Sequence, residues 1–82
     1  MHEYSLVQSL FDRIGAVATE QHAVAVKRVR VTIGDQAGVD PQLFQSAYEI
    51  YQIRTLCADA PLEIARLPGA DLTLDSLELE VP

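Results

Sequence analysis

The stretch Arg28-Val29-Arg30-Val31-Thr32-Ile33 alternates charged or polar side chains with β-branched apolar ones. Because successive side chains of a β-strand point to opposite faces, this alternation predicts a strand with one buried and one solvated face. Upstream, Val24 and Val26 occupy the opposite phase. We therefore expect a strand over residues 24–34, with either a β-bulge near Lys27 or packing of the two valines under a neighbouring helix.

An amphipathic segment precedes this strand. Residues 4–21 place apolar side chains at the i, i+3, i+4, i+7 spacing of a helix, with Phe11 at the flank. The predicted apolar face consists of Leu6, Val7, Leu10, Ile14, Val17 and Ala18. Gly15 costs about 1 kcal/mol relative to Ala in a helix interior, so we expect another element to approach the chain closely there.

A second helix follows the strand. Asp40 is a good N-cap because its carboxylate can accept the first N–H groups of the helix, and Pro41 suits the first helical position. The helix is expected to extend to about Ile53. Its predicted apolar face consists of Leu43, Phe44, Ala47, Tyr48, Ile50 and Tyr51.

Two further alternating segments complete the chain. Residues 62–66 predict one strand, and residues 72–81 predict another whose phase shifts by one residue at Asp75-Ser76. A strand that keeps one face buried needs a bulge at such a shift. The intervening Pro68-Gly69-Ala70-Asp71 is typical of a tight turn, so we expect these two strands to pair as an antiparallel hairpin.

The predicted order is helix, strand, helix, strand, strand, within one domain spanning residues 1–82. Elements with one apolar face each pack as two layers. We therefore expect an α+β fold in which a three-stranded sheet carries both helices on one face. The pattern leaves the order of the strands open. Exposed strand edges also favour a homodimer.

Composition excludes several classes of function. A net charge of −6 disfavours nucleic-acid binding, which needs clustered Lys and Arg. The single Cys57 excludes an internal disulfide and a Cys-rich zinc site. No apolar run is long enough to span a membrane and no signal-peptide pattern opens the chain, so we expect a cytoplasmic protein. The sequence has no nucleophile beside a base and no Gly-rich phosphate loop, so we do not expect an enzyme.

The opening Met1-His2-Glu3 carries the one arrangement that suggests chemistry. The α-amino group, the His2 backbone nitrogen and the His2 imidazole can chelate one ion. Nitrogen donors of this kind favour the square-planar geometry of Ni(II) or Cu(II). A His at the second position also arises by chance, so the triplet alone carries little weight.

The chain as a whole resembles the HypA family of nickel metallochaperones in hydrogenase and urease maturation. The resemblance rests on an ordered set of segments. They include Met1-His2-Glu3-Tyr4-Ser5-Leu6, Val29-Arg30-Val31-Thr32-Ile33-Gly34, Gly38-Val39-Asp40-Pro41 and Leu74-Asp75-Ser76-Leu77-Glu78-Leu79-Glu80. It implies Ni(II) as cargo, and a HypB-type GTPase and a hydrogenase precursor as partners.

One segment departs from the family pattern. The family normally carries a zinc-binding insertion with two Cys-x-x-Cys pairs between its last two strands, where this chain has only residues 67–71. We therefore expect no zinc. The chain is either a natural short form or an engineered fragment without the zinc domain, and the turn-like replacement favours the second.

The resemblance also implies a nickel site at Met1, His2 and Glu3. The Glu3 backbone nitrogen or carboxylate is the candidate fourth donor, although a carboxylate in a first helical turn also has a structural use. The resemblance also suggests Asp40 as a residue that hydrogen-bonds to the nickel site rather than ligating the ion. Its role as the N-cap of the second helix would by itself explain an aspartate at this position. His22 and Cys57 are expected to be structural.

Three functions remain open on these grounds. The first is a nickel carrier for NiFe-hydrogenase maturation. The second is a protein-interaction module, such as one that docks to the nickel GTPase, with no metal bound. The third is an engineered fragment that binds nickel and cannot support maturation.

Overall fold

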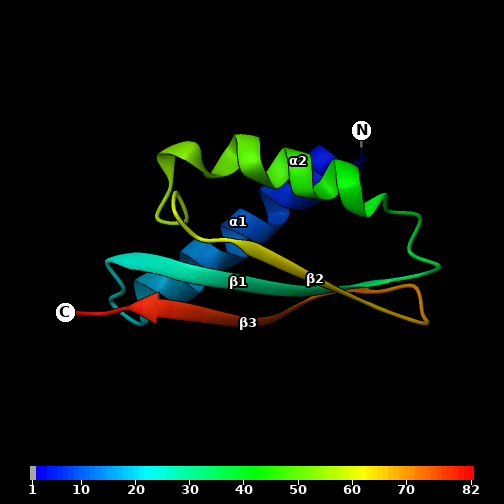
Figure 1. The fold of residues 1–82 in the computed structure, drawn as a ribbon. Helices are drawn as coiled ribbons and strands as arrows, with labels where there is room; N and C mark the ends of the chain where they lie inside the picture. The colour runs from blue at the N-terminus through cyan, green and yellow to red at the C-terminus, as the bar shows by residue number, and fades with distance from the viewer. Residues whose placement is uncertain (1) are drawn as a thin grey trace.

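The computed structural model describes residues 2–82, with His2 described in its backbone only. The helices are α1 (His2–Glu20), α2 (Pro41–Tyr51) and a short 3-10 helix, η1 (Gln52–Arg54). The strands are β1 (Ala25–Gly34), β2 (Leu62–Leu67) and β3 (Leu72–Glu80). Both α-helices cover one face of the three-stranded sheet, as the two-layer α+β prediction required (Figure 1).

Helix α1 buries the face that its periodicity predicts. Val7, Leu10, Ile14 and Ala18 are at most 5% exposed. Phe11, expected at the flank, is 8% exposed and belongs to the core as well. It stacks on Tyr51 of α2, with ring centroids 4.8 Å apart. The helix begins at His2, two residues earlier than the pattern predicted.

The expectation of a close neighbour at Gly15 is wrong. A Cβ atom added at this glycine would meet nothing within 4 Å. Gly15 lies on the exposed side of α1, and the structure offers no packing reason for it.

Strand β1 is the centre of the sheet. The sheet order is β2-β1-β3, with β2 parallel and β3 antiparallel to β1. Val29, Val31 and Ile33 are fully buried, whereas most of β2 and β3 is half-buried or exposed. The most apolar strand therefore has a neighbour on each side, and the edges are left to the two strands with less apolar surface.

This order makes the predicted β2–β3 hairpin wrong. Residues 68–71 do not close a two-strand turn; they cross the end of β1 to join its two neighbours. Backbone hydrogen bonds hold the crossing, from Gly34 N–H to Asp71 O and from Gln36 N–H to Gly69 O, both at 2.8 Å. A Cβ atom at Gly34 would lie 2.2 Å from Gly69 O, so the crossing requires glycine at Gly34.

Of the two alternatives for Val24 and Val26, the bulge near Lys27 is present, and so is the bulge predicted at residues 75–76. The register between β1 and β3 shifts between Val26 and Arg28, which places an extra residue at Lys27. It shifts again where Arg30 pairs with Ser76 and Val31 pairs with Leu74, which leaves Asp75 as the extra residue of β3. Each bulge returns the apolar phase to the helix-covered face.

Helix α2 starts as predicted, but its apolar face is narrower. Phe44, Ala47 and Tyr48 are buried, whereas Leu43 and Ile50 are 55% and 66% exposed. Because α1 and the sheet together cover only one side of this short helix, part of its apolar surface faces outward.

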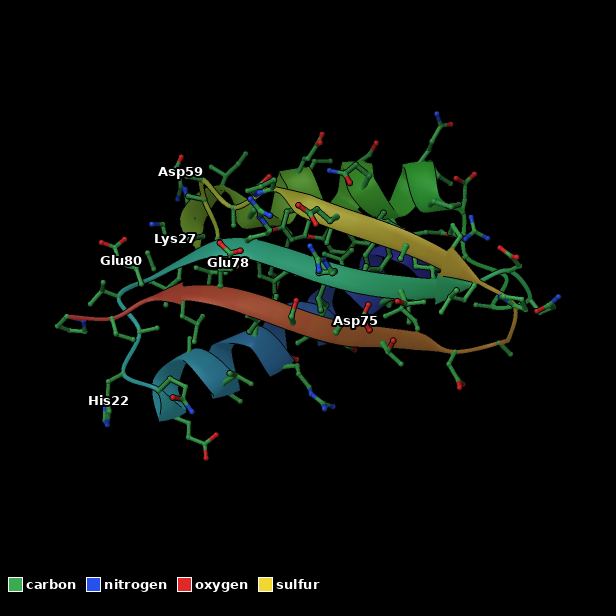
Figure 2. The ribbon with its side chains drawn as sticks, turned by 60° about the horizontal axis from the view of Figure 1, so that its bottom comes forward. His22, Lys27, Asp59, Asp75, Glu78 and Glu80 are labelled. Carbon is green, nitrogen blue, oxygen red and sulfur yellow. The ribbon has the colours of Figure 1, made fainter. Side chains whose placement is uncertain are left out.

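The sheet face away from the helices is polar (Figure 2). Arg30 donates from Nε and Nη2 to Glu63 Oε1 at 3.1 and 2.9 Å, and Arg28 Nη1 pairs with Glu63 Oε2 at 3.3 Å. Arg28 and Arg30 of β1 therefore share one carboxylate of β2. This is the solvated strand face that the alternation predicted.

Candidate metal centre

The start of α1 is tied to the start of α2 by one hydrogen bond. The backbone N–H of Asp40 donates to Glu3 Oε2 at 3.1 Å. Glu3 lies in the first turn of α1, and Asp40 is the residue that precedes α2. The N-terminal ends of the two helices therefore meet at the same end of the molecule (Figure 1).

Asp40 caps α2 as its sequence context predicted. Its backbone is extended, with φ −82° and ψ 115°, and its Oδ1 accepts from the N–H groups of Gln42 and Leu43 at 2.9 and 3.3 Å. These bonds satisfy two of the donors that a helix N-terminus leaves without intrahelical partners. Asp40 thus donates its backbone N–H to Glu3, while its carboxylate caps α2.

Aromatic contacts hold the two helices in this arrangement. Tyr4, next to Glu3, lies 5.8 Å from Tyr51 between ring centroids. Phe11 lies 5.2 Å from Tyr48, whose hydroxyl donates to Ala60 O at 2.9 Å. The position of Glu3 relative to Asp40 therefore depends on a buried contact between the helices as well as on the hydrogen bond.

The electrostatics of this end favour carboxylate anions. The Asp40 N–H, followed by the N–H of Glu3 itself, lowers the pKa of the Glu3 carboxyl below its usual value. Each helix N-terminus carries a partial positive charge, which opposes a bound cation. The carboxylates of Glu3 and Asp40 offset that opposition where the two helices meet.

The structure brings together two of the four residues proposed for nickel. Glu3 and Asp40 are in contact, whereas Met1 and the His2 side chain lie outside the described residues. Within residues 2–82 as described, no group of three or more His, Cys, Asp or Glu side chains is placed to hold a metal. A metal site at this end would therefore need donors from Met1 and His2 in addition to Glu3.

His22 and Cys57, the remaining side chains that could in principle bind a metal, have structural roles. His22 ends α1 with φ 57°, and the N–H groups of His22 and Ala23 bond to Thr19 O and Ala18 O, the pattern of a Schellman cap. It lies just beyond the C-terminal end of α1 (Figure 2), whereas Glu3 lies in the first turn of that helix. Cys57 is 1% exposed, and burial raises the pKa of its thiol.

Sequence reasoning missed the bond between Glu3 and Asp40 N–H. It identified both residues separately, the first as a first-turn carboxylate and the second as an N-cap. A sequence gives no crossing angle for two helices, so their contact could be raised only as an option.

A sequence model of one family matches most of the chain. The family is described as "Hydrogenase/urease nickel incorporation, metallochaperone, hypA", and the match covers residues 1–72. The hydrogenase maturation factor HypA of Wolinella succinogenes is 38% identical over 68 residues, which is 83% of this chain and 57% of that protein. HypA of Shewanella baltica strain OS185 is 35% identical over 75 residues, which is 92% of this chain and 64% of that protein. The chain thus spans less than two thirds of the length of these relatives.

Solved structures agree with this match. The solution structure of the Ni metallochaperone HypA from Helicobacter pylori superposes with a TM-score of 0.88 at 27% identity, covering 98% of each chain. A second structure, titled as a solution structure of HypA protein, gives a TM-score of 0.79 at 27% identity and covers 96% of each chain. In the described part of the chain, no helix is long and apolar enough to cross a membrane. By sequence and by fold, the chain belongs to the HypA family of nickel-incorporation metallochaperones, whose function is metal handling rather than catalysis.

Proposed function

We propose that the N-terminus of this chain binds Ni(II) as cargo. The donors are the Met1 amine, the His2 imidazole and backbone nitrogen, and either the backbone nitrogen or the carboxylate of Glu3. The contact between the first turn of α1 and the N-cap of α2 is the observation that carries this proposal, because it supplies anionic charge beside the terminus. Family membership supports it independently.

The backbone N–H groups of a first helical turn take no part in the hydrogen-bond ladder of the helix. Because the first N–H groups of an α-helix lie outside its i→i−4 ladder, using the His2 or Glu3 nitrogen as a metal ligand leaves that ladder of α1 intact; at Glu3 the ion would replace the contact of the N–H with its own carboxylate. Metal binding by such nitrogens releases protons, and affinity should therefore fall as the pH falls. A micromolar affinity, about −8 kcal/mol, would suit a carrier that must release its ion.

Asp40 acts in this proposal as a neighbouring charge rather than as a ligand. Its Oδ1 is engaged by Gln42 and Leu43, yet the carboxylate still contributes a full negative charge near Glu3. A unit charge a few ångströms from an ion contributes roughly 1 kcal/mol in a solvent-like dielectric. Removing it should weaken nickel binding a few-fold without removing the site.

The proposed destination of the ion is a NiFe-hydrogenase precursor, reached in the cytoplasm with a HypB-type nickel GTPase as partner. Relatives that this chain matches are named hydrogenase maturation factors. No zinc is part of this proposal, because residues 68–71 simply connect β2 to β3.

A Ni(II) titration by calorimetry tests the site. The untagged chain is compared with His2→Ala and with Asp40→Asn, which keeps a good N-cap and removes the charge. The proposal predicts loss of binding in the first variant, and in the second a few-fold weaker affinity with unchanged stability. Equal affinities for the parent chain and His2→Ala would contradict it.

The alternatives make different predictions. An interaction module without metal would bind the GTPase equally well before and after His2→Ala. A fragment that binds nickel but cannot support maturation would pass the titration and fail to restore hydrogenase activity in cells that lack their own HypA.

A further inference from the structure

The outer edge of β3 is open. In the sheet order β2-β1-β3, β3 pairs with β1 along one side only, and its nine residues present backbone groups along the other side. A strand edge of this length accepts a further strand through main-chain hydrogen bonds. Strand β2 is the other edge, but it is shorter, with six residues.

A hollow lies under this edge on the helix side of the sheet. It has a volume of about 360 Å³ and is lined by α1 and by the start of β3. Its lining residues are Leu6, Ser9, Leu10, Arg13, Leu72, Thr73 and Leu74. On a strand added beside β3, alternate side chains would point toward this hollow, so it is suited to apolar anchors.

The opposite face of the same edge is acidic. Residues 67–82 contain four carboxylates and no Lys or Arg. Asp75, Glu78 and Glu80 are spaced along β3 in Figure 2. The only ion pair of this segment in the described structure joins Glu78 to Arg28 at 3.9 Å, and Asp75 is bound to the hydroxyls of Thr32 and Thr73. By contrast, the carboxylate of β2, Glu63, is already paired with two arginines.

The acidic face of β3 indicates which kind of strand can pair with this edge. A second copy that paired through its own β3 would bring two acidic faces side by side, and like charges across a strand pair are destabilising. A strand bearing Lys or Arg on that face and apolar side chains on the other complements both surfaces.

We propose that the outer edge of β3 is a docking site for an extended basic segment of a partner protein. The segment adds as a fourth strand, with apolar side chains in the hollow beside α1 and Lys or Arg side chains against the acidic face. The hollow begins at Leu6, about one helical turn from Glu3, but no residue of this surface takes part in the Glu3–Asp40 contact, so strand docking can be tested apart from nickel binding.

A peptide that alternates lysine with valine is the probe, and one that alternates glutamate with valine is its control. NMR of the full chain should show the lysine peptide slowing amide exchange in residues 72–80, with no such effect from the glutamate peptide. Protection confined to β2, protection by both peptides alike, or no protection at all would overturn the proposal.

Two variants test the parts of the surface separately. Glu78→Gln combined with Glu80→Gln should weaken binding of the lysine peptide about tenfold, because each opposite-charge pair contributes up to about 1 kcal/mol. Glu20→Gln with Glu49→Gln makes the same change of net charge on exposed helix positions and should leave binding unchanged.

The hollow is tested by Ser9→Phe, which fills it from the exposed side of α1. Ser46→Phe, at an exposed position of α2, is the matched control. Binding should be lost in the first and kept in the second. Equal binding by both phenylalanine variants, or by both double-glutamine variants, would show that the peptide does not use this edge.

Discussion

Glu3 is the side chain that joins the two helices at the proposed nickel site. Its carboxylate accepts the Asp40 N–H, which lowers the pKa of Glu3 below its usual value. A lowered pKa in the folded state means that the tether contributes stability above the unfolded-state pKa. The contribution is lost as the pH falls through the folded-state pKa.

We therefore expect Glu3 to titrate below the usual range for a glutamate in the metal-free chain. An NMR titration that follows its carboxyl carbon and the Asp40 amide should give the same midpoint for both nuclei. Because Glu3 is at the surface, the accompanying change in stability should be small. A Glu3 midpoint at or above the usual glutamate value would contradict the observed hydrogen bond. So would an Asp40 amide signal that does not shift as Glu3 titrates.

His22 is a second residue whose role is set by backbone conformation. With φ 57° it occupies the left-handed position of the α1 C-cap, where glycine carries no steric cost. His22→Gly should therefore stabilise the chain by up to about 1 kcal/mol in urea denaturation. Thr19→Gly, inside the last turn of the same helix, should destabilise it by about half that amount or more. A destabilised His22→Gly variant would show that the imidazole makes a contribution of its own.

Among the helices and strands, those with local signals were predictable. The Asp40-Pro41 start of α2 follows from capping chemistry, and both bulges follow from phase shifts in the alternation. The wider apolar face predicted for α2 was wrong at Leu43 and Ile50, because periodicity marks apolar side chains and does not say how many neighbours will cover them.

The order of the strands was beyond a local signal. Pro68-Gly69-Ala70-Asp71 has turn chemistry, and a turn of that composition serves a hairpin or a crossing equally well. What decides between them is β1, which is fully buried along its inner face and must have a neighbour on both sides. The same reasoning applies to the site, since Glu3 and Asp40 were identified singly while their contact depends on how α1 packs against α2.

Gly34, at the crossing, and Gly15, on the exposed side of α1, should respond in opposite ways to substitution by alanine. At Gly34 an added Cβ would collide with the backbone of Gly69, so Gly34→Ala should destabilise the chain by about 1–3 kcal/mol. At Gly15 an added Cβ meets nothing, so Gly15→Ala should stabilise it by up to about 1 kcal/mol through helix propensity. Urea denaturation of both variants checks the pair. Equal effects would mean that residues 68–71 do not pass over the end of β1 as described.

The two proposed activities of the whole molecule use different residues. Both helices begin at one end, where Glu3 meets Asp40, whereas the acidic edge of β3 runs along the side of the sheet (Figure 2). Nickel binding and strand docking can therefore be removed one at a time. A HypA-family chain with both properties would carry its ion at a terminus while holding a partner through its sheet.

In the proposed site, the chain terminus itself holds the ion. The absorption spectrum of the Ni(II)-loaded chain with a free Met1 amine tests it most directly, beside the same chain with extra residues placed before Met1. A yellow, diamagnetic, square-planar species should form only when the amine is free, because the amine and adjacent backbone nitrogen supply two of the four donors. An identical spectrum and affinity for the two chains would contradict it.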